Sequence, residues 1–441
     1  MFELYGRAFS CCDGLSRRSF LRAGALGLGG LSLDGVLRAQ ASASDASRLS
    51  KDAAVIYIEL AGGPTHFETY DPKPLAPVEY RGPLSTVATC TSGVHFSELM
   101  SEQAKVMNRL AVIRSMHHDS ASHQTSSHLT QTGYYLRDRQ NPDNEMPCFG
   151  SIAARTRGAN SSGVPAFVSI PRKMRYGGSA YLGQGFHPFE PGGDPAKANF
   201  SVPNLSLVKG LDAERLTDRQ QLVAAFDSHR RVVDNRGLSE ALDRFTHQAM
   251  ELVTSERART AFDLTREDDR TREHYGRGTT GQSVLLARRL VEAGVTCVTV
   301  RVGGWDDHAQ LAKRMKERAP QYDRALAALV SDLAERGMDR DVLVVAMGEF
   351  GRTPRINKTA GRDHWGSVMS VLLAGGALRM GQVIGSSSPK GETPVDAPYR
   401  PENVLAMVYR HLGISPETTF NDFAGRPRYV LERHEPIAEL I

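Results

Sequence analysis

Short apolar runs alternate along the chain with segments in which apolar residues recur at helical spacing. An apolar run bounded by turn residues predicts a buried strand, whereas apolar positions three and four residues apart predict an amphipathic helix. We expect strands over residues 53–60, 111–114, 165–170, 295–302, 341–347 and 367–374. We expect helices over residues 97–110, 120–132, 282–294, 320–336 and 401–412.

The alternation of strands and helices predicts an α/β fold, with a mostly parallel sheet covered by helices on both faces. One stretch, at about residues 175–280, departs from this pattern. Loops rich in glycine, proline and aromatic residues come first, and a charged segment with helical spacing follows from Ala213 to Phe262. Two interpretations fit equally well: a partly helical insertion or cap on the sheet domain, or a segment that only completes that domain.

The amino-terminal residues predict an export signal. Residues 16–22 read Ser-Arg-Arg-Ser-Phe-Leu-Arg, which matches the twin-arginine signal, and a weakly apolar stretch and small-residue cleavage sites follow. That stretch is too short and too polar for a stable membrane span. We expect a cleaved signal peptide at 1–41, a linker at 42–50 and the folded domain at 51–441. The twin-arginine export machinery would then deliver the protein to the periplasm or the exterior. The alternative is a chance arginine pair in a terminal tail.

The composition is that of a globular protein, and its charge argues against one class of partner. Of the 441 residues 40% are hydrophobic, which is enough for a large core. The formal net charge is only +4, and no dense stripe of Lys and Arg appears, so nucleic acid is not an expected partner. Only Cys90, Cys148 and Cys297 remain after signal cleavage, so the fold does not depend on a disulfide scaffold.

Acidic side chains and histidines follow two of the predicted strands. Asp306 and His308 come after the run at 295–302, and Glu349 comes after the run at 341–347. An open α/β sheet places its ligands at the carboxyl ends of its strands. In extended backbone Asp306 and His308 point the same way. Glu349 is interpreted as a metal ligand in preference to a salt-bridge partner of Arg352. Carboxylates and imidazoles together are ligands for divalent metals.

Three further segments add candidate ligands. A Gly-Gly-Pro turn follows the first strand and precedes His66 and Asp71. Asp363 and His364 form a second acid–imidazole pair between glycines. Four of the fourteen histidines lie in residues 115–128, and one or two of them are expected to face the site.

Segments 62–74, 303–308, 348–354 and 361–366, with the twin-arginine signal, resemble the secreted bacterial proteins of domain-of-unknown-function family 1501. That family belongs to the alkaline phosphatase-like superfamily, with the sulfatases and the cofactor-independent phosphoglycerate mutases. The resemblance covers nearly the whole mature chain. It implies a three-layer α/β/α sandwich with two divalent metal ions at the carboxyl edge of the sheet. The residues do not distinguish zinc from manganese or calcium.

The resemblance also implies roles for the metal ligands. By position, Asp306 and His308 resemble ligands of one ion, and His364, with Asp363, resembles the last ligand. Glu349 stands where the superfamily usually has Asp-His. The Asp ligand of the first strand is missing from this chain, and His66, Glu68 or Asp71 is expected to replace it.

The nucleophile departs from the superfamily pattern. Its place, at the start of the helix after the second strand, falls at His123, with Ser122 beside it. The Cys-x-Pro-x-Arg motif of sulfatases is missing, so sulfatase activity is not implied. His123 is expected to be a ligand or a nucleophile, and a metal-bound water is the alternative.

Three cations are candidates to neutralise an anionic substrate. They are Lys73, Arg114 and Arg352, of which the arginines suit bidentate contact with phosphate or sulfate oxygens. We therefore expect an exported metal-dependent hydrolase of a phosphate or sulfate ester, either a small anionic ester or a sulfated or phosphorylated glycan. A non-catalytic exported binding protein that keeps the fold, and a structural envelope protein without metal, are the alternatives.

Overall fold

The computed structural model describes residues 50–203, 205 and 251–441. The expected signal peptide, nearly all of the expected linker, and most of the charged helical segment at 213–262 lie outside these residues. The fold below is therefore that of the domain that begins at Lys51.

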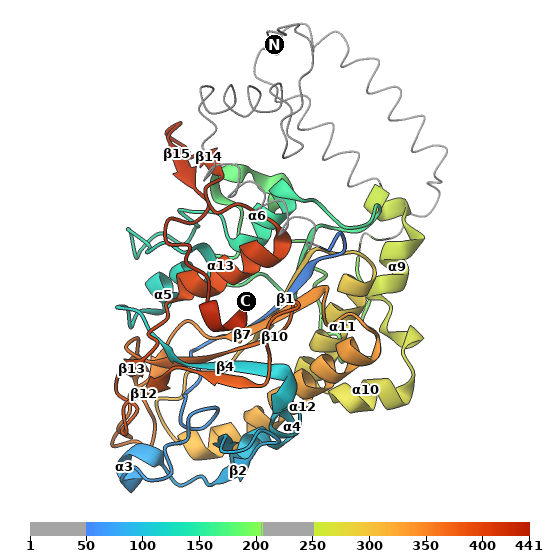
Figure 1. The fold of residues 1–441 in the computed structure, drawn as a ribbon. Coiled ribbons are helices and arrows are strands. Elements are labelled where there is room, and N and C mark those ends of the chain that lie inside the picture. Colours follow the sequence, from blue (N-terminus) through green and yellow to red (C-terminus); the bar gives the residue numbers. More distant parts are fainter. Residues whose placement is uncertain (1–49, 204, 206–250) are drawn as a thin grey trace, which may run out of the picture. The chain divides into compact units, whose positions relative to one another are not determined.

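A seven-stranded sheet in the order β11-β4-β10-β7-β1-β6-β5 forms the middle of this domain (Figure 1). Its strands are β1 (Ala54–Leu60), β4 (Leu110–Met116), β5 (Phe167–Ile170), β6 (Cys297–Val302), β7 (Val342–Met347), β10 (Met369–Gly375) and β11 (Gln382–Ile384). All neighbours pair in parallel except β10, which is antiparallel to both β4 and β7. The expected mostly parallel sheet is confirmed.

Helices cover both faces of the sheet and make three layers. On one face lie α4 (Ser101–Lys105), α9 (Glu256–Phe262), α10 (Asp269–Tyr275), α11 (Thr279–Glu292) and α12 (Leu311–Glu335). On the other lie α5 (His123–Thr132), α6 (Phe149–Thr156) and α13 (Pro401–Leu412). Alternate residues of β1 enter the two cores, Ile56 and Ile58 on the first face, Val55 and Tyr57 on the second. The three-layer α/β/α architecture is therefore confirmed.

Smaller elements connect these layers. Four two-stranded sheets pair β2 (Thr86–Ala88) with β3 (His95–Ser97), β8 (Gly351–Arg352) with β9 (His364–Trp365), β12 (Ser386–Ser387) with β13 (Pro394–Asp396), and β14 (Thr419–Asn421) with β15 (Pro427–Tyr429). The short helices are α3 (Val78–Arg81), η1 (Glu98–Met100), η2 (Met107–Arg109), η3 (Ala180–Leu182), η4 (Gln184–Phe186), η5 (Leu264–Arg266) and η6 (Ala438–Leu440). No helix among the described residues has the length and apolar character to cross a membrane.

Two helix predictions were wrong in their extent. The helix expected at 97–110 is divided into η1, α4 and η2, although Ser97 caps η1 as expected, its Oγ accepting from the Leu99 N–H. The helix expected to begin at Pro320 begins at Leu311 and contains that proline. Buried residues lie on both sides of Pro320, including Met315 and Tyr322, so tertiary packing outweighs the loss of one helical hydrogen bond.

One edge of the sheet collects the segments that carry candidate chemistry. The carboxyl ends of β1, β4, β6 and β7 lie there because these strands run in the same direction. Since β10 runs the opposite way, its amino end reaches the same edge. The loops after the four strands and the segment before β10 therefore meet at this edge.

Candidate metal centre

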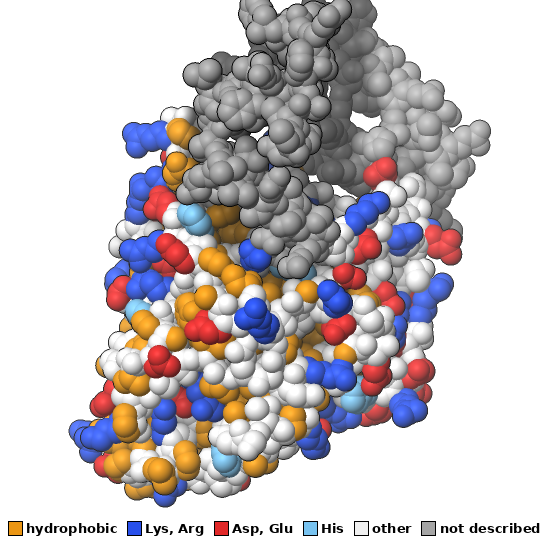
Figure 2. All heavy atoms as spheres, viewed as in Figure 1, with side chains coloured by type: hydrophobic (Ala, Val, Ile, Leu, Met, Phe, Trp, Pro, Cys, Tyr) orange, Lys and Arg blue, Asp and Glu red, His pale blue; other side chains and the backbone are white. Residues whose placement is uncertain are grey.

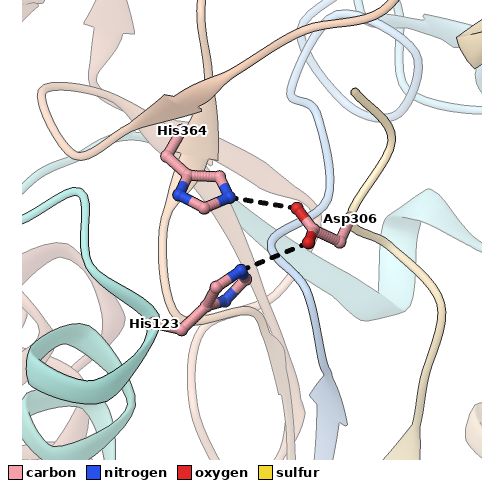
Figure 3. Close-up of side chains that lie close together, drawn as sticks. All are labelled: His123, Asp306 and His364. Atoms are coloured by element: carbon pink, nitrogen blue, oxygen red, sulfur yellow. Dashed lines mark hydrogen bonds and ion pairs between the residues drawn. The ribbon is translucent and has the colours of Figure 1, made fainter. Parts of the chain in front are cut away.

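The Asp306 carboxylate faces two imidazoles that come from distant parts of the chain and lie against each other, with ring centroids 4.4 Å apart. His364, in β9, places Nε2 3.0 Å from Asp306 Oδ1, and His123, the first residue of α5, places Nε2 3.3 Å from Oδ2. Figure 3 shows the two rings one above the other on the same side of Asp306, each pointing at a different oxygen of the carboxylate. These three residues form the group in the described part of the chain whose ligand atoms are close enough to hold a metal ion.

A third imidazole joins this cluster. His308 Nε2 lies 3.0 Å from His364 Nε2 and 3.0 Å from Asp306 Oδ1. Asp306 and His308 face the same side of the backbone, as their alternate positions in the sequence predicted. Asp307 faces the other way, where it is buried and accepts from Arg318 Nη1 at 2.8 Å.

Each imidazole of the cluster is held through its other nitrogen. His123 Nδ1 donates to Glu349 Oε1 at 2.7 Å, His308 Nδ1 donates to Asp363 Oδ1 at 2.7 Å, and His364 Nδ1 donates to the Ala121 carbonyl at 3.0 Å. These tautomers follow from the hydrogen-bond network. Metal-binding histidines are oriented in this way, with a carboxylate or carbonyl on the far nitrogen.

The near nitrogens then form a site for a cation. In the neutral rings of His308 and His364 both Nε2 atoms carry lone pairs, and these face each other across 3.0 Å beside an anionic oxygen of Asp306. Such an arrangement needs a proton or a metal ion between the rings. Octahedral ligands at bond lengths of about 2.1 Å are roughly 3.0 Å apart, so the three atoms fit one face of a divalent ion's shell.

Local electrostatics favour an ionised carboxylate with a neutral imidazole. Burial acts to raise the pKa of Asp306, but the hydrogen bond from Arg352 and the positive charge of Arg352 outweigh it and hold that pKa well below its ordinary value. Burial, and then the charge of Arg352, lower the pKa of His364. The hydrogen bond to Glu349 raises the pKa of His123 against the effect of burial. His123 therefore holds a proton more readily than His364 does.

Arg352 holds the site together and is not free to meet a ligand. The side chain is fully buried, and its Nε donates to the Gly63 carbonyl at 2.9 Å. Its Nη1 donates to the Arg362 carbonyl at 3.0 Å, and its Nη2 contacts both Asp306 and the Gly62 carbonyl. We therefore place Arg352 as a support of Asp306, which differs from its expected contact with the substrate.

Glu349 also differs from its expected role. Both of its oxygens lie 3.0 Å from the Gly62 amide nitrogen, and Oε1 accepts from His123. The structure shows no ion pair between Glu349 and Arg352, so the salt-bridge alternative does not hold. The Glu349 carboxylate accepts from the far nitrogen of His123 and so orients its ring, as residues that support a metal ligand do.

Position 62, which lies against the backbone of Asp306, requires glycine. Its φ is +116°, and an added Cβ would lie 2.5 Å from the Asp306 amide nitrogen. The Gly-Gly turn therefore lets the β1 loop contact the β6 loop directly, which brings the Gly62 N–H to Glu349.

Four of the expected residues form a separate buried group. Asp71 pairs with Lys73 Nζ at 3.1 Å and with Arg114 Nε at 3.7 Å, and it accepts from Ser387 Oγ at 2.5 Å. His66 Nε2 lies 3.0 Å from the Gly391 carbonyl, and burial lowers its pKa to about 4. The segment after β1 thus turns toward residues 387–391, and His66 and Asp71 are not brought to Asp306.

The remaining histidines and Ser122 have other contacts. Ser122 Oγ donates to Gln124 Oε1 at 3.0 Å. His118 is buried and its Nε2 donates to the Glu349 carbonyl at 2.7 Å, while His128 Nδ1 donates to the Tyr134 carbonyl. Of the described histidines in residues 115–128, His123 is the one whose ring reaches the Asp306 cluster.

We did not predict from the sequence an ion pair that joins two neighbouring strands of the sheet. Glu59 on β1 lies opposite Arg301 on β6, and their Oε2 and Nε are 3.2 Å apart. Gln131 Nε2 of α5 donates to Glu59 Oε1 at 3.3 Å. Burial, and then the charge of Glu349, raise the pKa of Glu59 to about 8. The available signal for this pair was one charged residue near the end of each of two apolar runs, Glu59 in 53–60 and Arg301 in 295–302.

Comparison with known proteins places the chain in a family and among distant structural neighbours. Residues 52–441 match the family model described as "Protein of unknown function (DUF1501)". Comparison with curated proteins finds no match. The chain is similar to the PsFucS1 sulfatase from Pseudoalteromonas sp., with 11% identity, a TM-score of 0.39, and coverage of 86% of this chain and 72% of that one.

Two further solved structures are similar at the same level. One is the alkaline phosphatase from the Antarctic bacterium TAB5, with 9% identity, a TM-score of 0.36, and coverage of 82% of this chain and 98% of that one. The other is a 2-O GAG sulfatase, with 13% identity, a TM-score of 0.34, and coverage of 82% and 71%. The activities in these names are statements about those proteins.

Proposed function

The chain belongs to the DUF1501 family, and from the residues it gathers around Asp306 we propose that it is an exported metal-dependent hydrolase of phosphate or sulfate esters. The observation that carries this proposal is the set of three imidazoles, each held through Nδ1, whose Nε2 atoms turn toward one carboxylate. Such a set is typical of a metal centre and has no evident structural purpose at a half-exposed edge.

Asp306, His308 and His364 would hold one divalent ion. His123 and the second oxygen of Asp306 would offer two ligands to a second ion, since Asp306 presents Oδ1 and Oδ2 to different rings. A bound divalent ion polarises the ester and lowers the pKa of a bound water. We assign His123 as a ligand in preference to a nucleophile, because its Nε2 already faces Asp306 and its Nδ1 proton is held by Glu349.

Arg301 is the proposed contact for the anionic group of the substrate. Lys73 and Arg114 pair with Asp71, so neither takes that role in our proposal. Arg301 is the last residue but one of β6, the strand that leads to Asp306, and 28% of its side chain is exposed. Its Nε faces Glu59 and leaves the planar end of the guanidinium for bidentate contact with phosphate or sulfate oxygens.

The test combines metal analysis with a substrate screen. Purified mature protein would be analysed for bound metals and then assayed on aryl phosphates, phosphodiesters and aryl sulfates. Asp306→Asn is expected to lose metal and activity while its secondary structure is kept, and Asp339→Asn, an exposed aspartate, is the matched control. Full metal content in both Asp306→Asn and His308→Ala would refute the proposed centre.

A second variant tests the substrate contact. Arg301→Gln is expected to raise KM for every anionic ester while metal content stays the same. A metal-loaded protein that hydrolyses none of the esters would favour the second candidate, a non-catalytic binding protein. The observation on its side is the absence of a Ser, Thr or Cys at the first position of α5, which His123 occupies.

A further inference from the structure

A second concave site lies between the carboxyl end of α5 and the β14–β15 hairpin. It encloses about 740 Å³, within the range of roughly 300–1,000 Å³ usual for ligand sites. The side chains that matter for its chemistry are Tyr134, Tyr135, Arg137, Phe423, Arg426 and Arg428. None of these belongs to the Asp306 cluster, so this cleft is separate from the proposed metal centre.

Two guanidinium groups in the cleft form no ion pair with any other described side chain. Arg137 and Arg426 are exposed, and in the described part of the chain their side chains make no ion pair or hydrogen bond. The neighbouring acids are used by the backbone. Glu145 accepts from the Arg137 amide at 3.0 Å, and Asp422 accepts from the Arg426 amide at 3.0 Å. The two arginine head groups are therefore available to an anion from outside.

Aromatic rings lie beside these cations. Phe423, at the tip of the hairpin, is 81% exposed, and Tyr135 is 38% exposed. Arg428 lies over the Tyr134 ring, 5.6 Å from its centroid. On the face shown in Figure 2, basic and hydrophobic side chains gather over the β14–β15 hairpin, with acidic ones between them. Because Phe423 lines the same cleft as Arg137 and Arg426, the cleft offers an apolar ring face beside two cations.

We propose that this cleft binds an anionic oligosaccharide. Sulfate, phosphate or carboxylate groups would bind Arg137 and Arg426 through paired N–H groups, and the apolar face of a sugar ring would stack on Phe423. The acidic side chains Asp422 and Glu432 would accept from sugar hydroxyls. Those same acids repel a strand with a charge on every residue, which disfavours nucleic acid.

The cleft is connected to the loop that leads to the metal centre. Tyr135 OH donates to Asp119 Oδ2 at 3.2 Å, and Arg400 Nη2 donates to the same hydroxyl at 2.7 Å. Asp119 lies four residues before His123, in the loop that leads to α5. A glycan held in the cleft would therefore continue along this loop toward the metal centre, but its binding requires no turnover and does not depend on the proposed hydrolase activity.

The test measures binding of the mature protein to a sulfated tetrasaccharide by calorimetry, in chelator to remove any metal. The double variant R137Q/R426Q is expected to weaken binding about tenfold or more. Phe423→Ala is expected to weaken it severalfold, and Arg340→Gln, an exposed arginine outside the cleft, to leave it unchanged. Phosphorylated and uronate-containing tetrasaccharides identify which anion is preferred, and a neutral tetrasaccharide is expected not to bind.

The same measurements contain the outcomes that would overturn the proposal. Equal affinity in the double variant, with circular dichroism unchanged, would do so. If a single-stranded oligonucleotide bound more tightly than the sulfated tetrasaccharide, and R137Q/R426Q abolished that binding, the cleft would be assigned to nucleic acid. Loss of glycan binding in Asp306→Asn, with R137Q/R426Q unaffected, would place the sugar at the metal centre. Retained binding in Asp306→Asn supports the cleft and is independent of whether the hydrolase proposal holds.

Discussion

At the scale of single residues, three imidazoles meet the Asp306 carboxylate, and each has its own second partner. The partners differ in charge: Glu349 and Asp363 are carboxylates, while His364 is held by a neutral carbonyl. An anionic partner increases the basicity of an imidazole and so strengthens it as a ligand. The two carboxylate-backed rings are therefore expected to contribute more to metal affinity than His364 does.

Glu349→Gln tests this expectation. The substitution keeps the size of the side chain but removes the charge behind His123, so metal affinity is expected to fall about 10- to 100-fold. Competition with a chelator of known affinity would measure the change. The exposed Glu335→Gln serves as the control. Unchanged affinity in Glu349→Gln would show that Glu349 does not support a ligand.

His118 predicts how stability depends on pH. Its Nε2–H donates to the Glu349 carbonyl and its Nδ1 accepts from the Ser120 amide, so the ring is neutral in the folded protein. Burial lowers its pKa from the ordinary 6.5 to about 4. Between these values the unfolded chain binds the proton and the folded chain does not. The stabilisation is therefore complete above pH 6.5 and is lost as the pH falls toward 4.

His118→Gln is expected to reduce the slope of the unfolding free energy against pH in that window, by up to about 1.4 kcal/mol per pH unit. Chemical denaturation at several pH values, in the presence of chelator, would measure it. The exposed His434→Gln is the matched control and should keep the full slope. Identical slopes for the wild type and His118→Gln would contradict the assignment.

At the scale of elements, the apolar runs located the central strands because a strand buried on both faces needs apolar residues at almost every position. β1, β6 and β7 each lie within two residues of their expected bounds. The direction of β10 could not be predicted, since an apolar run carries no sign of direction. The division of the helix expected at 97–110 was missed because its apolar spacing is also compatible with short helical turns.

The candidate site could be predicted from the sequence to a similar extent. Asp306 and His308 were placed at the site because strand ends decide which edge of a sheet a residue reaches, whereas His364 was placed there by its pairing with Asp363 and by the family resemblance. That rule does not decide which way a loop turns. The segment after β1 follows a Gly-Gly turn and then packs toward residues 387–391, so His66 and Asp71 pair there. For the same reason the partners of Glu349 were not predictable.

Gly62→Ala tests the contact between the β1 and β6 loops. Both Gly62 and Gly93 have positive φ, but a Cβ at Gly62 would meet the Asp306 backbone at 2.5 Å, whereas one at Gly93 would have no atom within 4 Å. Gly93→Ala is therefore the matched control, expected to cost about 1–2 kcal/mol for backbone strain alone. Gly62→Ala is expected to cost clearly more and to weaken metal binding. Similar unfolding midpoints for the two variants would rule out the close approach.

At the scale of the whole molecule, the export route is the prediction that belongs to the full chain. Residues 16–22 resemble a twin-arginine signal, a route that carries folded proteins and so suits a protein that binds metal before transport. Replacing both Arg17 and Arg18 with Lys is expected to leave the precursor in the cytoplasm. Cell fractionation would detect it, with Arg7→Lys as the control. Normal export of the double variant would end this proposal.

The position of β10 has a consequence for synthesis. In the chain β10 follows both β4 and β7, but in the sheet it lies between them. A nascent chain that has not reached residues 369–375 therefore has no strand to join β4 to β7 and its neighbours. The segment just before β10 also carries His364. The strand that joins the two parts of the sheet and the imidazole that completes the Asp306 cluster are thus synthesised within a few residues of each other, after β1, β4, β6 and β7.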